Sequence, residues 1–145
     1  FDNLIITRSF SKAYGLAGLR VGYSVCSPLI ADFINRVREP FNVNYTAQVA
    51  AIAALSDAKY LNDSVEINTN GYEQLTSGFD ALKLNYIPSH ANFIAVEFNN
   101  AMNIYNDLLK EGVIVRPVEM KGYLRISIGT LNENNHLLSA LKKVL

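Results

Sequence analysis

The chain has 145 residues, of which half are hydrophobic and 18% are charged, as expected for a globular protein with a real core. Thirteen basic residues balance thirteen acidic ones, so no overall field favours nucleic acid or an anionic membrane surface. The single cysteine, Cys26, excludes an internal disulfide, and no apolar run reaches the roughly 18 residues of a membrane-spanning helix. We therefore expect a cytoplasmic protein. Because the chain opens on Phe1 inside an expected strand, we also expect it to be a fragment.

The first 45 residues predict two strands and a helix around a polar loop. Residues 3–7 form a short apolar run that is typical of a strand buried on both faces, and residues 19–25 predict a second strand. Ser27 and Pro28 then predict a helix start, with an N-cap hydroxyl followed by proline at the first helical position. Residues 39–45 are expected to form an extended linker.

Two helices are expected after the linker. Thr46 is expected to cap an alanine-rich helix that ends near Leu55. A longer helix with regularly spaced apolar residues is predicted to start at Ser56. Gly71 and Gly78 weaken this helix, so a bend or break is expected near them.

The last third of the chain predicts a small sheet with helices. In the first strand, Phe93 and Ala95 are expected to share one face, because side chains alternate along a strand. Asn99 or Asn100 is expected to cap one helix, and Asn132 the final one. The strands are expected at residues 92–98, 113–115 and 123–128. The order of these elements predicts a compact α/β unit.

Residues 9–23 carry the most informative pattern in the chain. A lysine that forms an imine needs a partly desolvated pocket in which its amine can become nucleophilic, and Lys12 is the candidate. A phosphate beside it needs hydroxyls, accessible backbone N–H groups and preferably a guanidinium, and Ser9, Ser11 and Arg20 carry such groups. Together these features suit pyridoxal 5′-phosphate (PLP). The alternative is a basic, glycine-rich surface turn between two strands.

The pattern S-x-S-K-x-x-G-L-x-G-L-R-x-G-Y resembles the lysine segment of the fold-type I, class I/II PLP-dependent aminotransferases. Within them the chain is most similar to the histidinol-phosphate aminotransferases, over residues 1–145 but only onto the later part of such an enzyme. The resemblance implies an α/β fold in which residues 1–44 end the large PLP-binding domain and residues 45–145 form the small C-terminal domain. It also implies that Lys12 is the Schiff-base lysine, that Ser9, Ser11 and Arg20 bind the cofactor phosphate, and that the full enzyme is a homodimer.

A second candidate site lies near the C-terminus, where Arg125 interrupts an otherwise apolar strand. An arginine in that setting is costly unless a carboxylate, a phosphate or a water-filled cleft meets it. The resemblance implies that Arg125 binds the substrate anion and that Arg116 helps to hold the substrate phosphate. The alternatives are a strand-end arginine that pairs with a local glutamate, or one that stacks on Tyr123.

The remaining polar residues give weaker indications. His90 and His136 lie far apart with no ligand-type spacing, so no metal site is expected. Asn92 is expected at a strand edge, satisfying backbone rather than contacting substrate. Tyr45 is a candidate for lining the cleft between the two domains.

The resemblance implies interconversion of histidinol phosphate and 2-oxoglutarate with imidazole acetol phosphate and glutamate, with small-molecule substrates and neither nucleic acid nor membrane as partner. Two readings remain beside it: another enzyme of the same class, such as an aromatic aminotransferase or a phosphothreonine-type decarboxylase, or a non-catalytic association module. In the family, the acidic partner of the pyridine nitrogen comes from earlier sequence, and no acidic residue here matches its motif. We therefore expect the 145 residues alone to be inactive.

Overall fold

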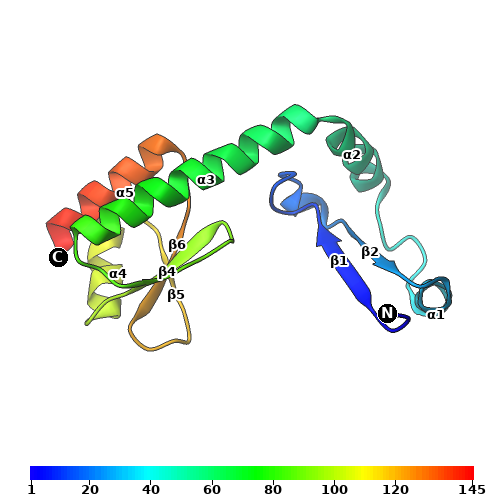
Figure 1. Cartoon of the computed structure of the whole chain (residues 1–145), viewed down its shortest axis with the longest axis horizontal. Helices are drawn as coiled ribbons and strands as arrows, with labels where there is room; N and C mark the ends of the chain where they lie inside the picture. The colour runs from blue at the N-terminus through cyan, green and yellow to red at the C-terminus, as the bar shows by residue number, and fades with distance from the viewer. The chain divides into compact units, whose positions relative to one another are not determined.

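The computed structural model describes all 145 residues and divides into two compact units, residues 1–65 and 66–145 (Figure 1). The division falls within one long helix, α3 (Ala58–Ala81). The expected boundary between residues 44 and 45 refers to the large and small domains of a complete enzyme, and it stays a prediction.

The first unit contains a two-stranded antiparallel sheet, β1 (Ile5–Ser9) and β2 (Gly22–Cys26). Both expected strands are present, each displaced toward the C-terminus. The expectation that the first is buried on both faces is wrong, because every residue of β1 is exposed. Its apolar composition suits a covered strand, but the sheet has only two strands and no layer of this unit buries them.

The helices of the first unit are α1 (Pro28–Val37) and α2 (Tyr45–Ser56), followed by the start of α3. Ser27 is the N-cap of α1 with Pro28 at the first helical position, as predicted. The cap of α2 is Asn44 rather than Thr46. The Asn44 side-chain oxygen accepts a hydrogen bond from the Ala47 N–H at 2.8 Å, and asparagine is the stronger N-cap residue.

The second unit is a four-stranded antiparallel sheet in the order β3-β4-β6-β5, with the end of α3, α4 (Ala101–Lys110) and α5 (Leu131–Val144) packed against it (Figure 1). The strands are β3 (Tyr86–Ile87), β4 (Phe93–Glu97), β5 (Arg116–Pro117) and β6 (Tyr123–Ser127). Alternate residues of β4 and β6 are buried in the core between the sheet and the helices: Ile94, Val96, Leu124 and Ile126.

Two local expectations for this unit need correction. Residues 113–115 do not form a strand, because the Val113 N–H bonds back to the Leu108 carbonyl at 2.9 Å and pairing with β6 starts only at Arg116. The last helix is capped by Thr130, not Asn132. Thr130 and Glu133 form a reciprocal capping box, which satisfies two backbone N–H groups and therefore fixes the helix start.

The long helix α3 is continuous, so neither Gly71 nor Gly78 breaks it. A Cβ at Gly71 would lie 2.6 Å from Ile128 Cγ2, and one at Gly78 would overlap the end of the Leu138 side chain. Both glycines therefore permit close packing of α3 on its neighbours.

Candidate functional site

The lysine segment closes the hairpin formed by β1 and β2. Ser9 lies opposite Gly22 at the last pair of the ladder, and the Phe10 N–H donates to the Val21 carbonyl at 3.2 Å just beyond it. The structure thus brings Ser9, Ser11, Lys12 and Arg20 to the closed end of one hairpin. A Cβ at Gly22 would lie 2.6 Å from the Arg8 carbonyl oxygen, so this close pairing needs glycine.

Backbone and side-chain hydrogen bonds shape the start of this loop. The Ser9 Oγ accepts a bond from the Ser11 N–H at 3.0 Å, and the Lys12 carbonyl accepts one from the Gly15 N–H at 2.8 Å. Gly15 has φ of 69°, a left-handed conformation that favours glycine. The Lys12 side chain is exposed and makes no ion pair within the chain, so these residues do not by themselves form the partly desolvated pocket expected around its amine.

A buried aromatic residue anchors the loop. Phe10 is only 4% exposed, and its ring lies 4.9 Å from that of Tyr14 and 5.8 Å from that of Tyr23 between centroids. The Leu16 N–H also donates a hydrogen bond to the Phe10 carbonyl at 2.9 Å. Phe10 therefore gives the polar residues on either side of it a fixed base. The sequence pattern predicted roles for those polar neighbours but gave no indication that Phe10 anchors the loop.

Arg20 ends the short 3-10 helix Ala17–Leu19 in a left-handed conformation, with φ of 55°. Its Nη1 donates to the Ala17 carbonyl at 2.8 Å, and the rest of its guanidinium is exposed. A Cβ at Gly18 would meet nothing within 4 Å, so the space beside this turn is open. The loop can therefore offer hydroxyl, backbone and guanidinium donors to an anion.

The two arginines of the second candidate site are direct cross-strand partners. Arg116 on β5 lies opposite Arg125 on β6, and Ala95 of β4 lies on the other side of Arg125. Like charges directly opposite in a sheet are destabilising, so an anion between them would offset an unfavourable contact. Neither alternative for Arg125 is seen, because no ion pair joins it to a glutamate and its cation–π contact is with a ring other than that of Tyr123.

The aromatic partner of Arg125 is instead Phe93. The Arg125 Cζ lies 4.6 Å from the centroid of the Phe93 ring, and its Nε is buried without a hydrogen-bond partner. A buried, unpaired guanidinium N–H costs free energy until an acceptor reaches it. The sequence signal for Phe93 was its place on the strand face predicted to carry Ala95, which the structure confirms.

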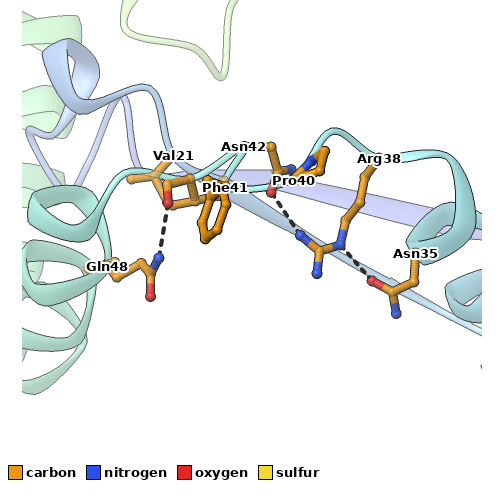
Figure 2. A pocket seen from close by; sticks show the side chains of 10 residues that line it. Val21, Asn35, Arg38, Pro40, Phe41, Asn42 and Gln48 are labelled. Carbon is orange, nitrogen blue, oxygen red and sulfur yellow. Dashed lines mark hydrogen bonds between the residues drawn. The ribbon is translucent and has the colours of Figure 1, made fainter.

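A surface hollow of about 770 Å³ lies elsewhere in the first unit, beside the linker between α1 and α2. Figure 2 shows Arg38 at its edge, donating to Asn35 at 2.9 Å and to Asn42 at 3.0 Å. Phe41 also lines it, 96% exposed and with φ of 56°. None of the predicted site residues lines this hollow, and neither does Tyr45.

The other polar candidates show no catalytic arrangement. His136 Nε2 lies 3.1 Å from the Glu111 carbonyl oxygen, and no group of three or more His, Cys, Asp or Glu side chains gathers as a metal site would require. Asn92 is exposed, and its carbonyl accepts a bond from the Ile128 N–H at 2.9 Å, as a strand-edge residue would. No helix combines the length and the apolar character needed to cross a membrane.

The lysine hairpin and the α/β unit define a class of protein: the chain belongs to the family of class I and II aminotransferases, whose model matches residues 2–141. It is 53% identical over its whole length to a histidinol-phosphate aminotransferase from Methylobacillus flagellatus, and 55% identical over 99% of its length to one from Pseudomonas aeruginosa. It spans 40% of the length of each of these relatives.

Solved structures confirm the predicted fold class. A putative aminotransferase from Burkholderia pseudomallei superposes with a TM-score of 0.94 at 28% identity, covering 98% of this chain and 45% of that one. Histidinol-phosphate aminotransferase from Sinorhizobium meliloti, solved in complex with pyridoxal-5′-phosphate, superposes with a TM-score of 0.89 at 32% identity. The match covers 99% of this chain and 41% of that one. The fold-type I resemblance therefore holds over the whole chain.

Proposed function

We propose that this chain is the C-terminal part of a PLP-dependent histidinol-phosphate aminotransferase that acts as a cytoplasmic homodimer in histidine biosynthesis. The observation that carries the proposal is the 53% identity to such an enzyme across the entire chain. The reaction is interconversion of histidinol phosphate and 2-oxoglutarate with imidazole acetol phosphate and glutamate. The domain division at residues 44 and 45 belongs to the same proposal.

The closed end of the lysine hairpin fits the cofactor by the chemistry of its donors. Ser9, Ser11 and Arg20 would hold the phosphate, and the exposed amine of Lys12 would attach the cofactor. When bound, PLP supplies an electron sink for the bonds at the substrate Cα. Once the substrate amine has displaced Lys12 from the cofactor, the freed Lys12 amine would act as the base that takes the Cα proton.

The arginine pair supports the substrate side of the proposal. Arg125 would bind the carboxylate of glutamate or the phosphate of the other substrate, because its buried Nε lacks an acceptor within the chain. Arg116 lies across the strand and would assist with the phosphate, whose larger charge two guanidiniums can share. One pocket that takes both substrates in turn predicts ping-pong kinetics.

The cofactor half is tested on the complete protein that contains residues 1–145. Borohydride reduction followed by peptide mapping should place the cofactor on Lys12, and Lys12→Arg should abolish the visible absorbance band. Arg20→Ala should weaken PLP binding by about 1.5–3 kcal/mol, the scale of a charge-assisted hydrogen bond. Arg36→Ala on exposed α1 is the matched control and should leave the affinity unchanged. Labelling chiefly on another lysine would refute the assignment.

The substrate half is tested by single-turnover measurements of both half-reactions. Arg125→Ala should lower kcat/KM for glutamate and for histidinol phosphate, since both would use the same guanidinium. The loss should correspond to about 2–4 kcal/mol of transition-state stabilisation. Arg116→Ala should affect the phosphorylated substrate more than glutamate. If Arg125→Ala leaves both half-reactions of the PLP-loaded enzyme unchanged, the anion-binding role is wrong. Turnover of aromatic amino acids or decarboxylation, without turnover of histidinol phosphate, would indicate another enzyme of this class.

A further inference from the structure

The sheet of the second unit has one face buried in the core and one that carries Arg125. Leu124 and Ile126 point into the core on either side of Arg125 in β6, so Arg125 points the other way. Ala95 is its direct partner on β4, and Phe93 lies two residues before Ala95 on the same face. Phe93 is therefore a diagonal neighbour of Arg125, within reach of a long side chain.

The contact between them has an unusual combination of properties. The guanidinium carbon lies 4.6 Å from the ring centroid, whereas the buried Nε has no hydrogen-bond partner. A carboxylate or carbonyl in the place of Phe93 would have accepted from the guanidinium and occupied its donors. An aromatic ring attracts the cation through its quadrupole without accepting those hydrogen bonds. The ring thus restrains the position of the group and leaves its donors for a ligand.

We propose that Phe93 is a positioning residue that holds the Arg125 guanidinium over its ring, so that the guanidinium is already oriented to donate to the substrate anion. This rests on the anion-binding role of Arg125 in the proposed function. The residue acts by pre-organisation: without the ring, the long arginine side chain samples more rotamers, and binding an anion must restrict them again.

The first test follows Arg125 directly and does not depend on turnover. The Arg125 Nε–H resonance of the complete protein is monitored by NMR while inorganic phosphate is added. We expect Phe93→Leu to remove the ring-current shift of this resonance and to weaken phosphate binding about 5- to 30-fold, as loss of a cation–π contact implies. Phe93→Tyr, which retains a ring, should restore both. Ile87→Ala, which removes apolar bulk opposite Ala95, is the matched control and should leave both unchanged.

The second test separates positioning from general stability. Phe93→Leu should lower kcat/KM for histidinol phosphate but not for histidinol, which lacks the phosphate, and it should have no further effect in an Arg125→Ala background. If Phe93→Leu does not fold, fluorinated phenylalanines at position 93 preserve the shape of the ring, and phosphate affinity should fall as fluorines are added. Additive losses with Arg125→Ala, or a flat fluorination series, would overturn the proposal. Lack of turnover with intact phosphate binding would instead refute the proposed function.

Discussion

Replacing Gly15 with alanine is the most direct test of the lysine hairpin. Gly15 has φ of 69°, and its N–H donates to the Lys12 carbonyl at 2.8 Å, so its conformation sets the turn that presents Lys12. A Cβ at this position would lie 2.6 Å from the Tyr60 Oη. The substitution therefore has two separate costs, one in the backbone and one in packing.

The backbone cost is the larger of the two. Holding an L-residue in the left-handed region costs about 1–2 kcal/mol. The packing cost is small, because the Tyr60 Oη is the far end of a side chain that is 51% exposed and can move aside. We therefore expect Gly15→Ala to lower the free energy of unfolding of this unit by about 1–2 kcal/mol, and adding Tyr60→Phe to recover less than half of the loss.

The assay is urea unfolding of the complete protein, followed by PLP titration of each variant. Gly18→Ala is the matched control in the same loop, because its φ is not positive and its Cβ would meet nothing within 4 Å. Gly15→Ala should weaken PLP binding more than Gly18→Ala. Equal effects of the two substitutions would refute the reasoning, and full recovery by Tyr60→Phe would show that packing, not backbone conformation, requires glycine.

Three further predictions concern stability and association. Gly71→Ala should lower the free energy of unfolding by about 1 kcal/mol in urea, because overpacking exceeds the gain in helix propensity, whereas Gly78→Ala should be nearly neutral since Leu138 can rotate. Hydrogen bonds from the Thr130 N–H and then its hydroxyl hold the pKa of Glu133 below its ordinary value. The stabilisation that they give is therefore present above the unfolded-state pKa and is lost as the pH falls through the lower, folded pKa. Thr130→Ala removes the hydroxyl, so NMR titration should give Glu133 a higher pKa in this variant than in the wild type, and equal pKa values would contradict the contribution of the hydroxyl. The 145-residue chain alone should associate in light scattering, because both strands of its two-stranded sheet expose apolar residues. It should also show no transaminase activity, because no acidic residue here matches the partner of the pyridine nitrogen; a monomer with activity would contradict both expectations.

The sequence allowed prediction wherever a short segment has one low-energy arrangement. Ser27 and Pro28 set the start of α1 because an N-cap followed by proline suits few other structures. The loop around Lys12 was predictable for the same reason, since its glycines, hydroxyls and arginine all occur within one turn-forming segment. The fold class followed from the family resemblance, which the solved structures confirm.

The errors arose where distant parts of the chain decide the outcome. Glycine weakens an isolated helix, yet Gly71 lies in a continuous α3 because Ile128, far along the sequence, packs against it. Val113 and Val115 have strand-forming side chains, but the Val113 N–H bonds back to the end of α4 and pairing with β6 starts only at Arg116. Phe93 could be placed on the correct face of its strand, whereas its contact with Arg125 depends on the register between β4 and β6.

The two candidate sites differ in what holds them in shape. Almost all of the buried apolar residues belong to the second unit, where the core fixes the strand that carries Arg125. In the first unit only Phe10 and Ala47 are buried apolar residues, so bonds and ring contacts within residues 9–23 fix the lysine hairpin. Core substitutions in the second unit should therefore disturb the anion binding that we propose for Arg125. The lysine hairpin should be most sensitive to changes within its own loop, above all at Gly15 and Phe10.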